Sequence, residues 1–414
     1  MNWKGEVLLL LVGWILPGAA TAALLLLFRD RWPEALARGR ALRWAVPLWL
    51  LSRVVYVLVL YRLPGFEGGG DFRFCVEGAR RVLGGEVPGR DFVNAYGPLF
   101  HHLNALGLLL APGGHPAGTL LGFLLGDALV VLLGWRLGRR LLGEEGGAWA
   151  GTWLLLSPLL WHQTVVRAAD ESVFLATLLG AVLLLDSGRA VLGMAVLGLG
   201  FCATKVSFGP YAAAVGAVLW FHGRDRLAGL LSFLGTCALV FGAYAAAGGD
   251  PFQVIGYPGE SLWFLNLSSP AFLLPVPWGR GAALAAYGAA VAWAAVRWSP
   301  PGRGGGFAWR AACALAAVHA ISMLVQPFMT VNWVCQGLAF LLLVLGAARD
   351  RPLGRALLWL LPVLGFLVCV TSDTGEPLYR WAAAPIFLLV HAGLLALLLR
   401  EPLPAVVGEE ARGA

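Results

Sequence analysis

Residues 63–110 read LPGFEGGGDFRFCVEGARRVLGGEVPGRDFVNAYGPLFHHLNALGLLL and form the longest polar interruption in a very apolar chain. The run Gly68-Gly69-Gly70 frees the backbone in front of Asp71, because glycine adopts conformations that other residues avoid. Behind it, apolar and charged residues separate onto two faces of a helix. The apolar face holds Phe72, Cys75, Val76, Ala79, Val82 and Leu83, and the charged face holds Arg73, Glu77, Arg80 and Arg81. This pattern predicts a short helix lying flat at a membrane surface.

The composition of the 414 residues indicates a membrane protein. The mean hydropathy is +0.76, and 13% of the residues are charged, against roughly 25% in a soluble domain. The net charge of +7 does not indicate nucleic acid, because the arginines lie in short loops between apolar runs rather than on one wet face. The six cysteines are scattered without a CxxC pair or a Cys/His cluster, so we expect neither a metal site nor a cofactor.

The apolar runs predict an all-α fold, a polytopic transmembrane helical bundle with about 13 spans. The predicted spans are 7–28, 44–61, 117–135, 148–164, 172–186, 190–204, 206–221, 227–247, 281–297, 310–326, 332–347, 356–371 and 381–399. Several are shorter than the roughly 20 residues that a simple span needs, so their boundaries are approximate. A cleaved signal peptide is the alternative for residues 1–22, because Ala20-Thr21-Ala22 resembles a cleavage site.

Three regions follow along the chain. Residues 1–43 hold an extra N-terminal span and a basic loop, residues 44–250 form a transmembrane module with the polar loop 64–116, and residues 251–414 hold the C-terminal helices. Most of the 30 Lys and Arg residues fall in alternate loops, which the positive-inside rule places in the cytoplasm. We therefore expect a multi-pass protein of the plasma membrane (a cell inner membrane), with loop 64–116 and the active face extracytoplasmic.

The predicted outer face collects ionisable residues that packing alone does not explain. They are Asp71 and Asp91 in the first loop, Arg167, Asp170 and Glu171 between two spans, Lys205 at the end of a span, and Arg380 in the last outer loop. Ionisable residues at membrane depth cost about 2.5–3.5 kcal/mol on insertion scales. They therefore tend to be paired, to line a cavity or to carry function.

Most of these candidates also have a structural interpretation. Asp71 could cap the helix that follows it. Asp170 and Glu171 could cap the next span and pair with Arg167. Lys205 could extend to the outer interface as a snorkelling side chain, or it could bind an anionic head group.

The remaining polar candidates of the second predicted span and of the loop after it have similar alternatives. Asp91 could belong to a turn. His101 and His102 could be interfacial histidines, since no third metal ligand lies near them in the sequence. Arg53 lies in the middle of a predicted span, and we expect it to pair with a buried carboxylate.

The predicted topology narrows the possible chemistry. Inner loops such as 29–43 are far too short for a nucleotide-binding domain, which takes on the order of 100 residues. ATP and nucleotide sugars are cytoplasmic substrates. An enzyme that works on the outer face must therefore take its activated group from a lipid carrier.

The order of the motifs resembles the GT-C superfamily of integral membrane glycosyltransferases, in particular polyprenyl-phosphate-sugar-dependent bacterial mannosyltransferases and protein-O-mannosyltransferase-like enzymes. The matching residues are Asp71, Tyr96-Gly97-Pro98-Leu99, the GRRLLG run 138–143, Ser157-Pro158, and Arg167 with Asp170-Glu171. The run 198–207, GLGFCATKVS, is similar to the lysine-bearing stretch of these enzymes. The resemblance covers roughly residues 64–225. The chain departs from the family in having Tyr96-Gly97-Pro98 for Tyr-Pro-Pro, and in its extra N-terminal span.

The resemblance implies that region 44–250 is a catalytic module that transfers a sugar with inversion from a polyprenyl-phosphate donor to a hydroxyl of a lipid, glycan or protein of the cell envelope. Asp71 would be the general base, and Lys205, with Arg167 or Arg380, would hold the leaving phosphate. Further substrate-binding candidates are Asp170, Glu171, Tyr96, His101 and Asp91. The sugar and the acceptor remain open.

The alternative function is a transporter or flippase for a lipid-linked saccharide. Such a protein would use similar head-group-binding residues. It should, however, place its key ionisable residues near the membrane midplane and open to both sides. In this chain the candidates concentrate on one predicted face. Membrane lipids are the expected surroundings in both cases, and no nucleic acid partner is expected.

Overall fold

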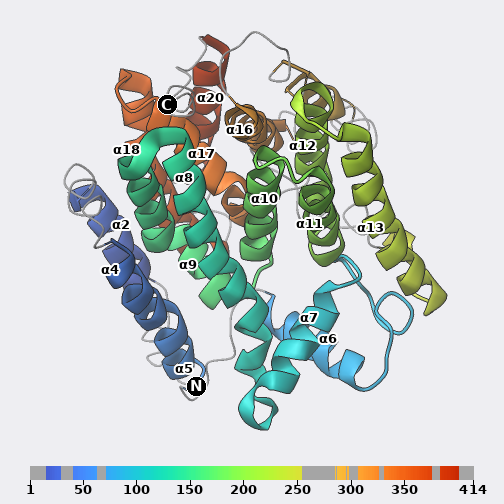
Figure 1. The fold of residues 1–414 in the computed structure, drawn as a ribbon. Coiled ribbons are helices and arrows are strands. Elements are labelled where there is room, and N and C mark those ends of the chain that lie inside the picture. The colour runs from blue at the N-terminus through green and yellow to red at the C-terminus, as the bar shows by residue number, and fades with distance from the viewer. Residues whose placement is uncertain are drawn as a thin grey trace, which may run out of the picture.

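The computed structural model describes residues 15–28, 41–62, 71–253, 285, 287–294, 296–297, 306–325, 331–374 and 383–400. Within these ranges the chain is helical, and no strand forms apart from a single bridge between Pro88 and Phe92. Figure 1 shows a bundle of long helices with two shorter ones, α6 (Phe72–Leu83) and α7 (Phe100–Leu110), packed at one end. The predicted all-α fold is confirmed.

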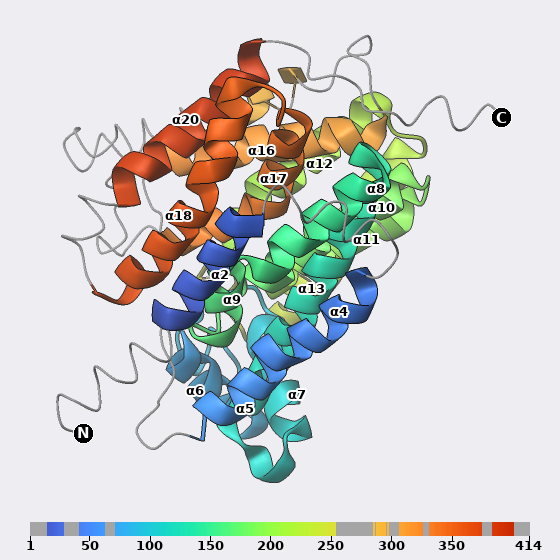
Figure 2. The same cartoon turned by 90° about the vertical axis from the view of Figure 1, so that its left-hand side faces the viewer.

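The N-terminal part of the bundle consists of α2 (Leu16–Phe28) and a second rod that corresponds to the predicted span 44–61. This rod is made of α4 (Ala41–Trp49), the π-helical segment η2 (Leu50–Val55) and α5 (Tyr56–Leu60). Figure 2 shows the rod beside α8 and α9 on the outside of the bundle. Short π-helical segments are frequent at functional or strained sites, and here η2 carries the buried Arg53.

After α6 and α7, the chain passes through the 3-10 turns η3 (Pro112–Gly114) and η4 (Pro116–Leu120) into α8 (Leu121–Leu156). Helix α8 is a helical hairpin. Its two arms meet at Gly143, whose φ of 80° lies in the region that favours glycine. The arms touch backbone to backbone, because a Cβ on Gly147 would lie 2.9 Å from the backbone nitrogen of Arg139. The first arm of the hairpin therefore corresponds to the predicted span 117–135, and the second arm holds the first part of the predicted span 148–164.

The second of these predicted spans is broken at Ser157-Pro158. The proline cannot continue the hydrogen-bonding of α8, and it occupies the first turn of α9 (Pro158–Val165), where its missing N–H is no loss. The Ser157 hydroxyl accepts a hydrogen bond from the Leu160 amide at 3.3 Å and caps the new helix. The chain then turns at Ala168, which has a positive φ of 55°, and enters α10.

The remaining helices complete the bundle. They are α10 (Glu171–Asp186), α11 (Ala190–Ala203), η5 (Val206–Phe208), α12 (Gly209–His222), α13 (Arg226–Ala246), α16 (Phe307–Val325), η8 (Val331–Gly337), α17 (Leu338–Ala347), α18 (Pro352–Thr374) and α20 (Ala384–Arg400). The core lies around α16 and α17, whose described side chains are almost all buried.

The membrane character of the fold is supported by the length and exposure of its helices. Among the described residues, four helical stretches are long and apolar enough to cross a membrane: Pro116–Leu156, Arg226–Ala246, Phe307–Val325 and Pro352–Val370. The outer α13 exposes Leu227, Leu231, Leu234 and Leu239, and monomeric soluble proteins rarely expose contiguous apolar patches of this kind. The count of 13 spans stays a prediction, since α10, α11 and α12 have only 14–16 residues.

Candidate functional site

The site begins with Asp71 at the start of α6. The predicted amphipathic helix forms there, and Phe72, Cys75, Val76 and Ala79 of its apolar face are buried. Asp71 occupies the N-cap position, but its side chain makes no capping hydrogen bond. Instead, its Oδ2 atom accepts a hydrogen bond from the Tyr96 hydroxyl at 2.7 Å. The capping interpretation of Asp71 is therefore wrong, and the carboxylate is turned toward the loop before α7.

The loop that carries Tyr96 is fixed against the C-terminal end of α11. The Gly97 amide donates to the Thr204 carbonyl at 2.7 Å, and the Leu99 amide donates to the Cys202 carbonyl at 2.9 Å. A Cβ on Gly97 would overlap the Cys202 carbonyl oxygen. This close approach gives a physical reason for glycine in the middle of Tyr96-Gly97-Pro98.

A second loop joins the site from the turn between α9 and α10. The Asp71 amide donates to the Arg167 carbonyl at 3.0 Å, and the buried Cys75 thiol donates to the Ala168 carbonyl at 3.5 Å. These contacts place the start of α6 beside Asp170 and Glu171 at the start of α10. Three segments that are distant in sequence therefore meet at one end of the bundle (Figure 1).

Lys205 lies at the centre of this meeting point. Its ammonium nitrogen lies 2.9 Å from Asp170 Oδ1, 3.4 Å from Glu171 Oε1 and 3.9 Å from Asp71 Oδ2. It also lies 5.0 Å from the centre of the Tyr96 ring. The Lys205 amide donates to Asp170 Oδ2 at 3.1 Å. We call Asp71, Tyr96, Asp170, Glu171 and Lys205 the lysine cluster.

The electrostatics of the lysine cluster follow from burial and charge. Burial opposes the charge of Lys205, but the carboxylates of Asp170, Glu171 and Asp71 outweigh this effect and raise its pKa. Burial also raises the pKa of Tyr96, and the nearby Asp71 carboxylate adds to the shift, so the phenol keeps its proton and acts as a donor. For Asp170, burial raises the pKa although Lys205 opposes the shift.

Exposure separates the three carboxylates of the lysine cluster. The side chains of Asp170 and Glu171 are 1% and 0% exposed, whereas that of Asp71 is 35% exposed and that of Lys205 is 18% exposed. Three carboxylates face one ammonium, so the cluster holds more negative than positive groups. Its open side is the side of Asp71.

The partners of Lys205 correct two structural alternatives from the sequence. Asp170 and Glu171 form their ion pairs with Lys205, so the expected pairing with Arg167 is not the arrangement seen. Lys205 itself does not extend away to the interface, because its ammonium is turned inward to the two buried carboxylates. Arg167 contributes its backbone carbonyl to the site.

Asp91 and His101 lie outside the lysine cluster. Asp91 is exposed in a turn, where its carboxylate receives Arg90 Nη2 at 2.7 Å and the Val87 amide at 2.7 Å. The Arg90 hydrogen bond, followed by the Val87 amide, lowers the pKa of Asp91 to about 2. This arrangement matches the turn alternative.

His101 is fully buried rather than interfacial, and the three aromatic rings nearest to it are phenylalanines. The ring centres of Phe74, Phe100 and Phe92 lie 4.9, 5.1 and 5.2 Å from its own. A Cβ on Gly78 would overlap the His101 ring, which shows how closely α6 and α7 pack there. A substrate-binding role for His101 stays a prediction. Arg380 lies outside the described residues.

The expectation that Arg53 pairs with a buried carboxylate is confirmed. The partner is Asp127 of α8, whose Oδ2 lies 3.2 Å from Arg53 Nε and accepts from Trp49 Nε1 at 2.6 Å. Thr164 Oγ1 donates to Asp127 Oδ1 at 3.4 Å. Asp127 was not among the residues selected from the sequence, although a single carboxylate inside a predicted span was a sufficient signal.

Asn94 is a polar residue that sequence reasoning did not select. It is fully buried, and its Oδ1 accepts from the Tyr96 amide at 3.0 Å while its Nδ2 donates to the Tyr244 hydroxyl at 3.4 Å. Asn94 therefore holds the backbone of Tyr96 and connects it to α13. Its position two residues before the tyrosine was the available signal.

The lysine cluster has the elements of acid–base chemistry on a substrate that approaches from its open side. It offers a partly exposed carboxylate, a neutral phenol that orients it and a cation beside it. In the described part of the chain, no group of three or more His, Cys, Asp or Glu residues is arranged to hold a metal ion. Comparisons with protein-family models, curated proteins and solved structures gave no match.

Proposed function

We propose that this protein is an integral membrane glycosyltransferase that moves a sugar from a polyprenyl-phosphate donor to an acceptor hydroxyl, with inversion at the sugar carbon and Asp71 as the general base. The observation that carries the proposal is the position of Asp71. It is the most exposed carboxylate of the lysine cluster, and it is oriented by the Tyr96 hydroxyl. A positioned carboxylate contributes roughly 10²–10⁴-fold to such a transfer by accepting a proton.

The oxygen of the acceptor hydroxyl attacks C1 of the sugar, and its proton passes to Asp71. Because Tyr96 donates to Oδ2, the proton goes to Oδ1. The bond between C1 and the phosphate oxygen breaks, and its electron pair leaves with the polyprenyl phosphate. A phosphate leaving group needs little protonation, so one base is sufficient.

The role of Lys205 in this step follows from its contacts. The ammonium is already shared by Asp170 and Glu171, so it is not a bare cation that waits for a phosphate. Its charge partly offsets the three carboxylates, which would otherwise repel an anionic donor. The exposed part of Lys205 then faces the leaving phosphate, with Arg167 and Arg380 as further candidates for that contact.

The orientation needs a test of its own, because the proposal requires the lysine cluster on the extracytoplasmic face of the plasma membrane. Cys75 is unsuitable for labelling, since it is fully buried. Glu77 is exposed on the charged face of α6. In a variant without native cysteines, Glu77→Cys should react with a membrane-impermeant thiol reagent from outside intact cells. Reaction only after the inner face is opened would refute the orientation and the need for a lipid donor.

The function is tested with purified protein, a radiolabelled polyprenyl-phosphate mannose and a panel of donors carrying other sugars. We expect the label to appear in a new glycosidic bond to a lipid, glycan or protein acceptor from the same membrane. Release of polyprenyl phosphate should match the label transferred. A panel that gives no glycosidic bond with any sugar, although the donor binds, would refute the proposal.

A transporter or flippase for a lipid-linked saccharide is the second candidate, and buried polar groups inside the bundle favour it. The Tyr211 hydroxyl and His319 Nδ1 form a hydrogen bond of 2.8 Å, and the ring of His391 lies 5.3 Å from that of His319. Ionisable groups at such positions often serve proton relays. Movement of labelled donor between the leaflets of a vesicle, without a new glycosidic bond, would support this alternative.

A further inference from the structure

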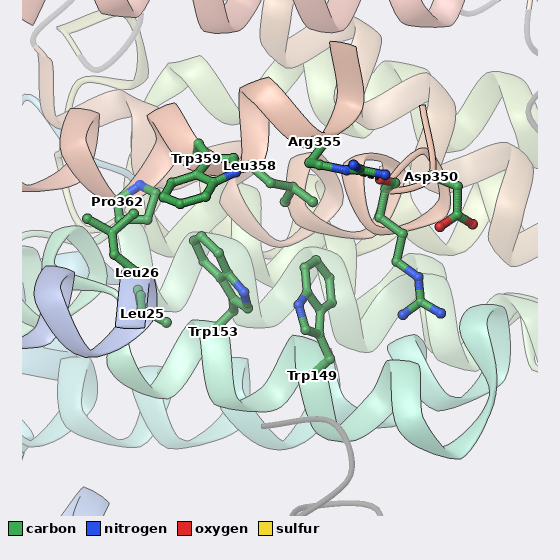
Figure 3. A pocket seen from close by; sticks show the side chains of 10 residues that line it. Leu25, Leu26, Trp149, Trp153, Asp350, Arg355, Leu358, Trp359 and Pro362 are labelled. Atoms are coloured by element: carbon green, nitrogen blue, oxygen red, sulfur yellow. Dashed lines mark hydrogen bonds between the residues drawn. The ribbon is translucent and has the colours of Figure 1, made fainter. Parts of the chain in front are cut away.

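A cavity of about 430 Å³ lies between α2, α8 and α18, away from the lysine cluster. Its apolar walls are formed by Leu25 and Leu26 of α2, Trp149 and Trp153 of α8, and Leu358, Trp359 and Pro362 of α18. Figure 3 shows the tryptophans of α8 facing Trp359 and Leu358 of α18 across the opening. The volume falls within the range of about 300–1,000 Å³ that is usual for ligand sites.

The cavity changes from apolar to charged at one end. Asp350 and Arg355 line it there (Figure 3). Arg349 also lines the cavity, and all three residues belong to the turn from α17 into α18 and its first helical residues. The Arg355 Nε atom donates to the Arg349 carbonyl at 3.5 Å, which holds the two arginines in one turn. Among the described residues, neither arginine forms an ion pair. Two guanidinium groups and one carboxylate leave this end with one net positive charge.

The charged end of the cavity lies at the end of the bundle that is opposite the lysine cluster. Helix α10 begins at Glu171 in the lysine cluster and ends at Asp186. The Oδ2 atom of Asp186 forms an ion pair with Arg140 Nε at 2.7 Å. Arg140 lies directly before the bend of α8 at Gly143, and Gly346 at the end of α17 lies beside Trp149. By the predicted topology, this end faces the inner leaflet.

We propose that this cavity binds one membrane phospholipid, with the phosphodiester on Arg349 and Arg355 and an acyl chain along Trp149, Trp153 and Trp359. The charges of the cavity and the lipid are complementary, because a phosphodiester carries one negative charge and planar guanidinium groups bind phosphate oxygens in pairs. Tryptophan is enriched where acyl chains meet head groups.

The site is independent of the proposed transferase reaction, so its test does not use turnover. Purified protein is reconstituted with phosphatidylglycerol and examined by native mass spectrometry, and bromine-labelled acyl chains are used to quench tryptophan fluorescence. We expect one retained lipid and strong quenching. Inorganic phosphate in excess should displace little of the lipid, because it lacks the acyl chain.

The variant that tests the charges is Arg349→Gln with Arg355→Gln, which changes exposed side chains and leaves the core intact. Retention of the lipid should fall by about tenfold or more, since each 1.4 kcal/mol of lost binding is a factor of ten. Arg226→Gln is the matched control, because Arg226 lies at the same end of the bundle but stacks on Trp220 of α12. Trp359→Ala, on a partly exposed wall residue, should weaken quenching.

Three results would overturn the proposal. One is equal lipid retention in the double arginine variant and in the Arg226→Gln control. Another is quenching that does not change in Trp359→Ala. The third is inorganic phosphate alone binding as tightly as the lipid, which would show that the arginines bind a free anion and that the apolar walls contribute nothing.

Discussion

The lysine cluster and the Arg53–Asp127 pair are both buried ionic sites, and they differ in two respects. Arg53 and Asp127 form a one-to-one pair with exposures of 1% and 0%, supported by hydrogen bonds from Trp49 and Thr164 to the carboxylate. The lysine cluster has three carboxylates for one ammonium, and Asp71 is 35% exposed. A closed site with balanced charges can act only to stabilise the fold. An open site with excess charge is better suited to bind a substrate or to react with it.

The largest effect on stability is expected when the closed pair is broken. Asp127→Ala leaves the Arg53 guanidinium buried without a counter-ion, and breaking a buried pair costs about 3–5 kcal/mol. Thermal unfolding in detergent should show a large drop in Tm. The double variant Arg53→Met with Asp127→Leu should recover much of this loss and keep turnover. A double variant that is stable but inactive would show that the pair also has a functional role.

A smaller loss of stability, with a large loss of turnover, is expected at Lys205. Lys205→Ala removes the cation from three carboxylates, but the cluster is partly open to water, so we expect about 1–3 kcal/mol of destabilisation. Apparent donor affinity should fall more than acceptor affinity, and Lys205→Arg should restore part of it. Unchanged donor affinity in Lys205→Ala would limit the residue to a structural role.

The pH dependence of the stabilising contribution of Lys205 follows from the direction in which the pKa of its ammonium group is shifted. The pKa of Lys205 is raised in the folded protein, so its stabilising effect is complete below the unfolded pKa of about 10.4. It is lost only as the pH rises through the folded value. The Tm difference between wild type and Lys205→Ala should therefore not shrink between pH 6 and pH 9, and it should grow toward pH 9, because burial raises the pKa of Glu171 to about 7 and Lys205 opposes that shift. A difference that shrinks within this range would contradict a charged Lys205.

A moderate effect is expected for the residue that orients Asp71. Tyr96→Phe removes the hydrogen bond to Asp71 Oδ2 but keeps the stacking on Phe100, whose ring centre is 3.8 Å away. A hydrogen bond to a charged group contributes about 1.5–3 kcal/mol, so turnover should fall about tenfold or more. The Tm should fall moderately, because the same hydrogen bond also stabilises the folded protein. Normal turnover in Tyr96→Phe would mean that the phenol does not position the base.

The smallest effect is expected at Asp91, on the surface. Asp91→Asn removes ionic contacts of an exposed turn, and exposed pairs contribute little. Turnover and Tm should stay close to wild type at neutral pH. Because the folded pKa is lowered to about 2, the contribution of Asp91 is present above the unfolded pKa of about 3.9 and is lost as the pH falls toward 2. A strong loss of turnover in Asp91→Asn would place this loop in the reaction.

The sequence predicted the fold class, the amphipathic helix α6 and the pairing of Arg53, because each depends on a local or compositional pattern. The break at Ser157-Pro158 inside the predicted span 148–164 was missed, because apolar residues continue on both sides of it. Hydropathy alone could not show that 117–135 and 148–164 belong to one hairpin.

The candidate site was predicted in its residue types but not in its pairings. Asp71, Asp170, Glu171 and Lys205 were all selected because they are charged residues at the ends of apolar runs. Which cation serves which carboxylate depends on three loops that meet only in the folded chain. The sequence therefore offered Arg167 as the partner of Asp170, and it could not anticipate that Tyr96 would hold Asp71.

The measurement that tests the central claim most directly is the turnover of Asp71→Asn on a polyprenyl-phosphate sugar, with Asp91→Asn assayed in parallel. Asparagine keeps the shape of aspartate and can still receive the Tyr96 hydrogen bond, but it cannot accept the acceptor's proton. We predict a loss of roughly 10²–10⁴-fold, with a normal Tm and near-normal donor binding. Retention of more than about a tenth of wild-type turnover, or an equal loss in both variants, would contradict Asp71 as the general base.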